Sequence, residues 1–235
     1  MNLAIVTPTR NRWQWLAQQA QRIAPQLGRD DLWIIVADND APPQGFEEAL
    51  TEMIGGERLV FCLLGYRRYE PPFARVNYAH NVGASLAPAE HAIVEIDDHD
   101  LIEPDALPAV RKSLDEGADY VCGWYKQDAL ITGPRGGRYI EPWPNAKPTY
   151  ELGAFGSGTA GDCGAGLRAI RRCIWNELGG WDTNVWPSAD RDLAIRAEAI
   201  GVRIVCLPQF LCTVLIDPDG ISATYKGGFP LEAAA

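Results

Sequence analysis

The sequence predicts an α/β protein in which helices cover both faces of a mostly parallel central sheet. Short apolar runs rich in β-branched residues alternate with longer amphipathic segments along the first half of the chain, and this alternation is typical of parallel sheets. Two of the apolar runs end in aspartates, Asp38 and Asp97. Because parallel strands end at one edge of the sheet, where α/β proteins bind ligands, we expect these aspartates to share a site.

Each element of the first half has its own local signal. Apolar runs predict strands at residues 3–7, 33–37, 58–64 and 92–96, of which all but 58–64 are expected to be buried. Amphipathic segments predict helices at about residues 13–23, 46–53, 76–86 and 104–116. Pro8 is expected to end the first strand, Asn11 to cap the first helix, and Pro104 to stand in the first turn of the fourth helix.

The second half of the chain is less regular. Residues 126–164 are rich in glycine, proline and aromatic residues, and Arg-Gly-Gly-Arg at 135–138 is expected at the tip of a hairpin. After residue 164, apolar runs predict strands at 167–170, 203–207 and 211–216. Helices are predicted at 172–178 and 190–200. Neither a repeat nor a linker is apparent, so we expect a single domain over residues 1–230.

Composition excludes several classes of partner and places the protein in the cytoplasm. The balance of 21 basic against 31 acidic side chains, a net charge of −10, argues against general binding to nucleic acid or anionic lipid. Six scattered cysteines without a CxxC spacing favour reduced thiols over structural zinc. The strand-like start of the chain argues against a signal peptide. The apolar stretch 204–216, interrupted by Pro208 and Gln209, is shorter than the roughly 20 residues of a membrane span.

The cluster Asp97-Asp98-His99-Asp100 directly follows the apolar run 92–96. Closely spaced carboxylates at the end of a buried strand are suited to Mg²⁺ or Mn²⁺, and they predict a site for a metal and a diphosphate. Two ligand pairs are possible, Asp97 with His99 or Asp98 with Asp100. An imidazole beside a carboxylate would favour Mn²⁺. The competing interpretation is a solvated acidic loop.

Four motifs occur along the chain in a fixed order. They are Val6–Arg12, Ile34–Asp40, Asn81–Gly83 followed by 96–100, and Gly179–Asp182 followed by 189–196. This ordered set, spanning residues 3 to about 200, resembles the family-2 glycosyltransferases, which have the GT-A fold. The resemblance implies a metal-dependent transfer of a sugar from a UDP- or GDP-sugar to an unidentified acceptor hydroxyl. Residues 1–125 would then bind the nucleotide, and residues 126–230 the acceptor.

The resemblance also implies roles for individual residues on the donor side. Asp38 would face the nucleobase and ribose, as a carboxylate that accepts hydrogen bonds; the alternative is an aspartate that merely ends a strand. The other residues implied to contact the donor are Thr7, Pro8, Thr9, Arg10, Arg75, Asn81, Asp97 and Asp98. For Arg75 the alternative is a solvated charge.

On the acceptor side, the resemblance assigns the general base to Asp190. This carboxylate would deprotonate the acceptor hydroxyl as it attacks the anomeric carbon, which inverts the configuration. Ala189 stands where the family usually has a glutamate. The alternative is that Asp190 only caps a helix. Asp192 and Arg196 are spaced to form an ion pair on that helix.

The metal cluster departs from the usual family pattern, because His99 occupies an aspartate position. Asp-x-His also resembles the metal motif of polypeptide N-acetylgalactosaminyltransferases, so retention of configuration stays possible. The family's C-terminal histidine is absent, and Asp217 or Asp219 stands in the comparable stretch. Either would be an oxygen ligand for the metal, or simply part of a Pro-Asp-Gly turn. His80 and His91 have no partner pattern and are interpreted as structural or exposed.

Two other functions remain as alternatives. A sugar-phosphate nucleotidyltransferase would also be an α/β protein with metal-binding aspartates, but its first strand-to-helix turn is rich in glycine. Residues 7–12 contain no glycine, which counts against this alternative. A non-catalytic module that binds a sugar nucleotide or a glycan is the second, because the glutamate and the C-terminal histidine are missing.

Overall fold

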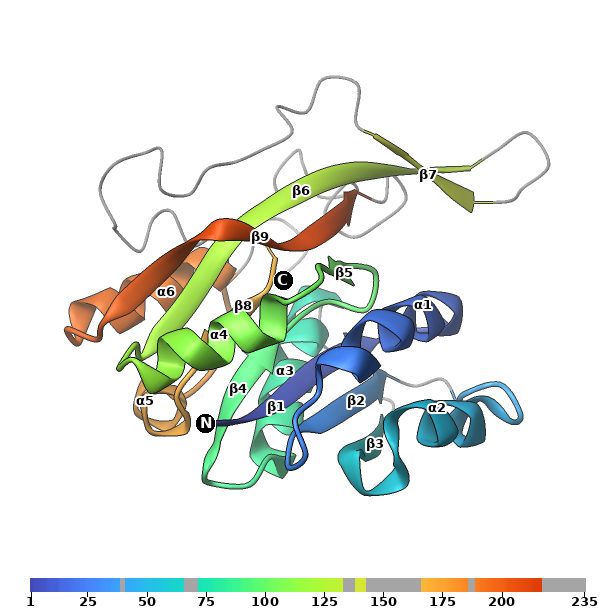
Figure 1. The fold of residues 1–235 in the computed structure, drawn as a ribbon, viewed down its shortest axis with the longest axis horizontal. Helices are drawn as coiled ribbons and strands as arrows, with labels where there is room; N and C mark the ends of the chain where they lie inside the picture. Colours follow the sequence, from blue (N-terminus) through green and yellow to red (C-terminus); the bar gives the residue numbers. More distant parts are fainter. Residues whose placement is uncertain (39–40, 66–71, 133–137, 143–165, 186–188, 217–235) are drawn as a thin grey trace, which may run out of the picture.

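The protein is built on one large mixed sheet (Figure 1), seen here in a computed structural model. The structure describes residues 1–38, 41–65, 72–132, 138–142, 166–185 and 189–216. The strands are β1 (Asn2–Thr9), β2 (Leu32–Asp38), β3 (Leu59–Leu64), β4 (His91–Glu95), β5 (Leu101–Ile102), β6 (Tyr120–Thr132), β7 (Arg138–Pro142), β8 (Arg168–Ile170) and β9 (Ile204–Ile216). They are arranged in the order β3-β2-β1-β4-β8-β6-β9-β5, and β7 pairs with β6.

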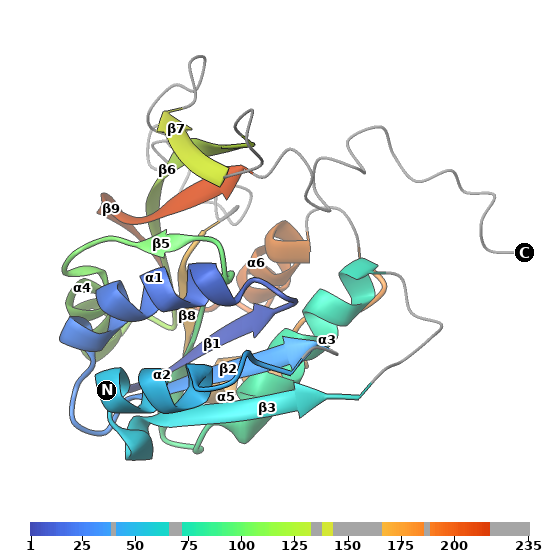
Figure 2. The same cartoon turned by 90° about the vertical axis from the view of Figure 1, so that its right-hand side faces the viewer.

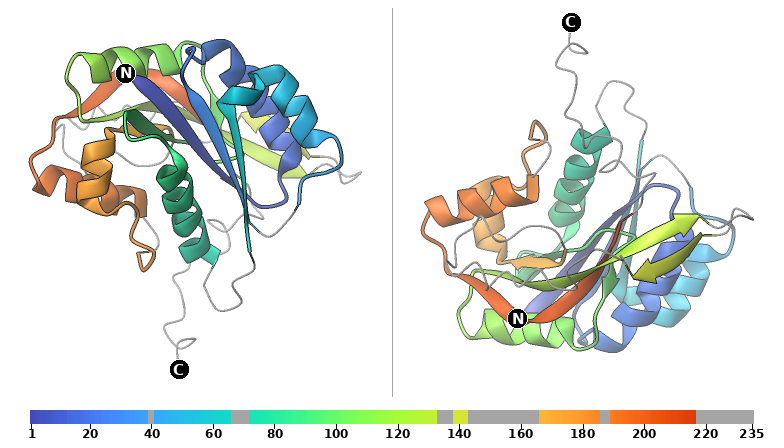
Figure 3. Two further views of the ribbon diagram at one scale, coloured as in Figure 1. Left: turned by 90° about the horizontal axis from the view of Figure 1, so that it is seen from below. Right: turned by 90° about the horizontal axis from the view of Figure 1, so that it is seen from above.

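Helices cover both faces of this sheet, as predicted. They are α1 (Trp13–Ile23), α2 (Phe46–Ile54), α3 (Pro72–Leu86), α4 (Ala106–Asp115), α5 (Arg172–Leu178) and α6 (Ala189–Ala199). Figure 3 shows α1, α2 and α4 on one face and α3, α5 and α6 on the other. Each group encloses its own apolar core against the sheet. The two-sided burial explains why β1, β2 and β4 are continuous apolar runs.

The first four strands along the chain form the parallel part of the sheet. β1 lies between β2 and β4, and β3 pairs with the outer side of β2. α3 packs very closely on these strands, because a Cβ added at Gly83 would lie 2.3 Å from Val6 Cγ1 and 3.0 Å from Val36 Cγ2. Because β1, β2 and β4 are parallel neighbours, they end at one edge of the sheet. This brings Asp38 and the cluster that follows Glu95 to the same side of the molecule.

Two local predictions about helix starts are wrong. The cap residue of α1 is Arg12, without a side-chain capping bond, while Asn11 lies one residue earlier with φ +53°. Pro104 precedes both the cap residue Asp105 and the first residue of α4. α1 nevertheless begins at Trp13, as expected, and only its cap residue differs, whereas α4 begins two residues later than its proline indicates.

The second half of the chain completes the sheet with antiparallel pairings of β8, β7 and β5 and with a parallel pairing of β6 and β9. β8 lies antiparallel between β4 and β6, and Figure 2 shows β6, β7 and β9 beyond the parallel strands. The two strands predicted at 203–207 and 211–216 form the single strand β9, which pairs with β6 through a register shift at Gly123 to Tyr125. β6 and β7 form a hairpin, whose predicted tip lies mostly outside the described residues. β5 was not predicted. Among the described helices, none is long and apolar enough to cross a membrane.

Candidate functional site

The loop after β4 is fastened to the protein by a glutamine of α1. The side-chain amide of Gln19 donates hydrogen bonds to the backbone oxygens of Asp97, at 3.0 Å, and Asp100, at 2.9 Å. Gln19 is fully buried and lies on the same face of α1 as the core residues Leu16 and Ile23. Sequence reasoning missed this residue, although a glutamine within an apolar helical stripe was a usable signal. These two hydrogen bonds, which we call the Gln19 clamp, hold the backbone of the acidic loop in a defined conformation.

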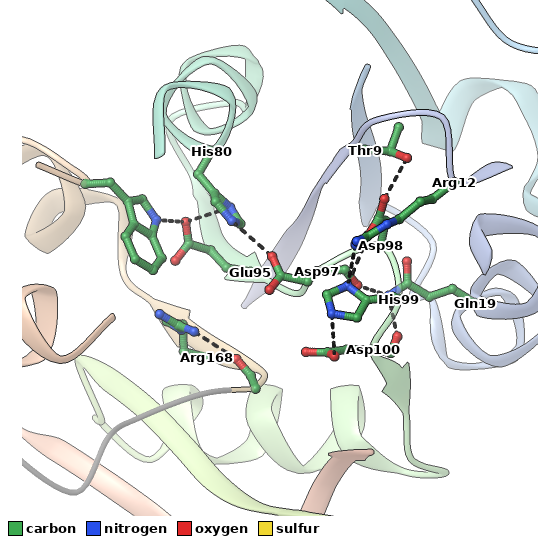
Figure 4. Close-up of polar contacts among 12 residues, drawn as sticks. Thr9, Arg12, Gln19, His80, Glu95, Asp97, Asp98, His99, Asp100 and Arg168 are labelled. Carbon is green, nitrogen blue, oxygen red and sulfur yellow. Dashed lines mark hydrogen bonds and ion pairs between the residues drawn. The ribbon is translucent and has the colours of Figure 1, made fainter. Parts of the chain in front are cut away.

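Two of the four cluster residues, Asp98 and Asp100, have buried carboxylates that accept hydrogen bonds from other parts of the protein. Asp98 is 4 % exposed; it accepts a hydrogen bond from Thr9 Oγ1 at 2.8 Å and lies 3.2 Å from Arg12 Nη1. Asp100 is 2 % exposed and accepts a 3.3 Å bond from the backbone N–H of Leu215. These contacts, several of them visible in Figure 4, direct both carboxylates toward β1, α1 and β9.

Asp97 and His99 are the more accessible members of the cluster. Their side chains are 49 % and 19 % exposed. His99 Nδ1 lies 3.1 Å from Asp98 Oδ1 and 3.2 Å from Arg12 Nη1, and its Nε2 lies 3.9 Å from Asp100 Oδ1. Within the described parts of the chain, no group of three or more His, Cys, Asp or Glu side chains is positioned to hold a metal ion. A metal here would therefore need oxygen ligands from a bound substrate or from other residues.

Behind Asp97 lies a buried polar cluster that sequence reasoning did not identify. His80 of α3 places Nε2 3.5 Å from Asp97 Oδ1 and Nδ1 3.3 Å from Glu95 Oε1. Glu95 also accepts a hydrogen bond from Trp181 Nε1. Neither His80 nor His91 is exposed; His91 contacts the backbone oxygen of Asp30 through Nε2 at 2.7 Å.

The acidic neighbours of the two site histidines keep both imidazoles protonated. Burial lowers the pKa of His80, but the charge of Glu95 and the hydrogen bonds with Asp97 and Glu95 raise it to about 9. Burial likewise lowers the pKa of His99, and the hydrogen bond with Asp98 together with nearby carboxylates raises it to about 9. At neutral pH each ring carries a positive charge beside the acidic loop.

The carboxylates of Asp97 and Asp100 are shifted in opposite directions. Loss of solvent raises the pKa of Asp97, but the hydrogen bond of His80 and the charge of His99 outweigh this and hold it well below its usual range. For Asp100, burial dominates over the charge of His99 and raises the pKa to about 7. Asp97 is thus the ionised, accessible carboxylate of the loop.

Arg168 places a further cation in the same region. It lies on β8 directly opposite Glu95 of β4, and its guanidinium carbon is 4.8 Å from the centroid of the Trp181 ring. Nη2 donates to the backbone oxygen of Gly166 at 3.1 Å, whereas Nε and Nη1 have no hydrogen-bond partner among the described residues. Burial lowers the pKa of Arg168, but the charges of neighbouring acidic groups raise it more strongly. These groups are Tyr120, Asp190, Glu95 and Asp97.

The predicted donor residues at the ends of β1 and β2 differ in accessibility. Thr7 is fully buried, and its hydroxyl accepts a 3.0 Å hydrogen bond from Trp33 Nε1. Pro8 is also buried, whereas Arg10 is exposed. Asp38, the last residue of β2, forms an ion pair with Arg75 of α3. Arg75 is therefore not the solvated charge of the alternative interpretation.

Asn81 connects α3 to the Gly-Gly-Trp-Asp turn. Its side-chain amide donates to the backbone oxygen of Trp181 at 2.9 Å and accepts from the backbone N–H of the same residue at 2.8 Å. Asn77, one turn earlier on α3, donates to the backbone oxygen of Asp182 at 2.8 Å. The predicted donor residue Asn81 thus uses both atoms of its amide group to hold the turn.

Asp190 lies in the first turn of α6, where it is partly exposed. Its Oδ1 accepts a 2.8 Å hydrogen bond from the backbone N–H of Arg191. The predicted ion pair between Asp192 and Arg196 is present at 2.8 Å, and Arg196 also binds the backbone oxygens that end α5. Asp217 and Asp219 lie outside the described residues.

The first of the three comparisons with known proteins concerns the family. Residues 4–179 match the family described as glycosyl transferase family 2. No curated protein sequence matches the chain significantly.

Solved structures share the fold. S. aureus TarS 1–349 is 15 % identical with a TM-score of 0.62, over 92 % of this chain and 60 % of that one. The mannosyltransferase PcManGT from Pyrobaculum calidifontis, solved with GDP-Man and Mn²⁺, is 19 % identical with a TM-score of 0.63, over 95 % and 59 %. TarS 1–349 in complex with UDP-GlcNAc is 16 % identical with a TM-score of 0.63, over 92 % and 59 %. The chain thus spans about 60 % of the length of these proteins.

Proposed function

The chain belongs to glycosyl transferase family 2, and we propose that it transfers a sugar from a UDP- or GDP-sugar to an acceptor hydroxyl with the help of a divalent metal. The observation that carries this proposal is the edge at which β1, β2 and β4 end, where Asp38 and the accessible Asp97 stand on either side of β1. The related folds include proteins solved with GDP-Man and Mn²⁺ and with UDP-GlcNAc, which supports a nucleotide-sugar donor.

Asp97 and His99 are the proposed metal-binding pair. Both are more exposed than Asp98 and Asp100, whose carboxylates already accept hydrogen bonds from the protein. One carboxylate and one imidazole fit Mn²⁺. His99 would bind the ion as the neutral imidazole, so it would release its proton when the metal binds, and ions of this kind complete their coordination with water and substrate phosphates. A bound Mn²⁺ would neutralise negative charge on the diphosphate as the bond between the sugar and the diphosphate breaks. Mg²⁺ is the second candidate.

The remaining donor contacts follow from the charges around this edge. Asp38, held by Arg75, is proposed to accept hydrogen bonds from the base and ribose, with the exposed Arg10 near the ribose or phosphates. Thr9 acts indirectly, because its hydroxyl holds Asp98. Arg168 adds a positive charge near Asp97 and Asp190, which favours an anionic ligand between them.

Asp190 is the proposed general base. It is the partly exposed carboxylate at the start of α6, and α6 is fixed to the end of α5 by Arg196. A carboxylate held on a rigid helix can accept the proton of an attacking hydroxyl within hydrogen-bond reach, and attack opposite the leaving diphosphate inverts the anomeric carbon. The scattered cysteines without a CxxC spacing support the cytoplasmic location proposed from composition.

Binding of nucleotides tests this proposal. Isothermal titration of UDP and GDP, with and without Mn²⁺, is expected to show metal-dependent binding in the wild-type protein. The double variant Asp97→Ala with His99→Ala is expected to lose the dependence on metal, while Asp30→Ala, an exposed carboxylate far from the cluster, keeps it. Metal-dependent affinity that survives in the double variant would refute the assigned pair. Release of pyrophosphate from a nucleoside triphosphate would instead favour the nucleotidyltransferase alternative.

A further inference from the structure

Two buried ionisable side chains stand directly behind Asp97, and the proposed reaction uses neither. His80 is 4 % exposed and Glu95, the last residue of β4, is 1 % exposed. Figure 4 shows His80 between Glu95 and Asp97, with one ring nitrogen toward each carboxylate. Burying such groups costs free energy that an apolar pair of the same volume would not. Their presence at this position therefore calls for an explanation.

The imidazole of His80 is constrained on its faces as well as at its nitrogens. Its ring stacks on the indole of Trp181, with centroids 5.1 Å apart and an angle of 23° between the planes. Trp181 is itself fixed by hydrogen bonds. Its Nε1–H donates to Glu95, and its backbone N–H and oxygen both bond to the side-chain amide of Asn81. The imidazole thus has one orientation, and in that orientation Nε2 faces the carboxylate of Asp97.

His91 provides a comparison within the same chain. It is also 4 % exposed, but it lies at the start of β4, at the opposite end of the strand from the cluster. Its ring contacts the backbone oxygen of Asp30 and lies 3.9 Å from the carboxylate of Glu90, which is exposed. The two histidines are equally buried, so burial alone does not explain why the one beside Asp97 is embedded in carboxylates.

We propose that His80 and Glu95 are positioning residues, which hold the carboxylate of Asp97 in the orientation that binds the metal and the donor diphosphate. Glu95 orients the imidazole, and the imidazole orients Asp97. This inference rests on the proposed function, since it assumes that Asp97 is a metal ligand. Residues that hydrogen-bond to metal-binding side chains restrict their orientation, and their loss typically weakens metal binding or activity about 10-fold to 100-fold.

The same cluster connects the donor side to the acceptor side. Trp181 belongs to the turn whose Gly180 oxygen accepts a 2.9 Å hydrogen bond from Arg196 of α6. α6 carries Asp190 in its first turn. A displacement of His80 would therefore reach Asp97 directly and the helix of the proposed base through Trp181. The direct contact makes metal binding the more sensitive measurement.

The test compares metal affinity across three variants. His80→Phe keeps a ring that can stack on Trp181 but removes both polar contacts, and Glu95→Gln keeps the shape of the side chain while removing its charge. Isothermal titration of Mn²⁺ in the presence of saturating UDP or GDP is expected to give affinities about 10-fold to 100-fold weaker than wild type for both. Metal-free nucleotide affinity is expected to stay unchanged. His91→Phe is expected to lower thermal stability without altering the affinity for Mn²⁺.

The conservative variant His80→Gln supplies a second line of evidence, because its amide can still hydrogen-bond to Asp97. Partial recovery of Mn²⁺ affinity relative to His80→Phe is expected. Should His80→Phe fail to fold, Glu95→Gln and His80→Gln carry the test alone. Wild-type Mn²⁺ affinity in the folded variants, with a loss of stability like that of His91→Phe, would overturn the inference. A wild-type protein that binds no Mn²⁺ with either nucleotide would instead overturn the metal site itself.

Discussion

The carboxylate of Asp38 and the guanidinium of Arg75 form an ion pair whose two side chains are only 12 % and 11 % exposed. Asp38 ends β2, and Arg75 stands in the first turn of α3. The pair joins two residues that the sequence assigned separately to the donor side. Because both charges are largely removed from water, each depends on the other.

Removing one partner of this pair is expected to destabilise the protein. Asp38→Ala removes the carboxylate that this mostly buried guanidinium contacts, which should lower the free energy of unfolding by roughly 3–5 kcal/mol. The double variant with Arg75→Met should regain much of that stability but not the affinity for UDP or GDP. Urea denaturation and isothermal titration measure the two effects. Full nucleotide affinity in the stable double variant would contradict the donor role of Asp38.

The clamp of Gln19 on the acidic loop is expected to affect donor binding. Gln19→Leu removes the side-chain donor to the backbone oxygens of Asp97 and Asp100, although the Asp97 oxygen still accepts a 3.1 Å bond from the backbone N–H of Asp100. The loss should cost roughly 1–3 kcal/mol of stability and weaken metal-dependent nucleotide binding. Gln26→Leu is the matched control, because Gln26 donates similar bonds to Arg22 and Glu103 away from the loop. If the two variants bind the nucleotide equally well, the clamp has no role in binding.

Transfer is expected to depend on Asp190 far more than folding does. Asp190→Asn keeps the shape of the side chain and should reduce turnover about 100-fold to 10,000-fold, the usual contribution of a general base. Asp192→Asn on the same helix should lose only the partly exposed pair with Arg196, worth less than about 1 kcal/mol, and retain activity. Donor turnover with Mn²⁺ provides the measurement. Equal activities in the two variants would assign Asp190 to the helix terminus alone.

The two glycines before Trp181 are expected to differ in their tolerance of alanine. Both have left-handed backbones, with φ +73° at Gly179 and +71° at Gly180, which costs an alanine about 1–2 kcal/mol. At Gly180 the new Cβ would also lie 2.4 Å from Asn81 Oδ1, whereas nothing is within 4 Å at Gly179. Gly180→Ala should therefore be destabilised by roughly 2 kcal/mol more, as measured by urea denaturation. Equal losses of unfolding free energy in the two variants would show that the turn adjusts to the added Cβ at Gly180 without strain.

The buried imidazole of His80 is expected to make stability depend on pH. Its pKa is raised from 6.5 to about 9 in the folded protein, so below pH 6.5 its stabilising contribution is fully present. As the pH rises toward 9 the folded protein loses this proton, and the free energy of unfolding should fall by about 2–3 kcal/mol. His80→Gln should show a smaller fall over that window in urea titrations. Parallel curves for the two proteins would contradict the raised pKa.

Local patterns predicted the strands and helices of the first half well, because most of those elements are buried along a continuous stripe or run; the edge strand β3 is only partly buried. The same patterns failed where pairing decides the structure. Residues 203–216 were expected as two strands on either side of Pro208 and Gln209, but continued pairing with β6 joins them into β9 through a register shift. The start of α1 at Trp13 was predicted, but its cap residue was misplaced by one residue: it is Arg12, which contacts Asp98 across the loop, and not Asn11.

The sequence by itself determined the family motifs, the α/β fold and the presence of acidic residues after β2 and β4. It left both ligand pairs in the Asp97 to Asp100 cluster open, since all four side chains have suitable chemistry. Only the tertiary structure gave the four side chains different accessibilities, by burying Asp98 against Thr9 and Asp100 against β9 while leaving Asp97 and His99 accessible. It also placed His80 behind Asp97. The physical reason is that burial and hydrogen bonding depend on groups from distant parts of the chain, which meet only when the layers pack.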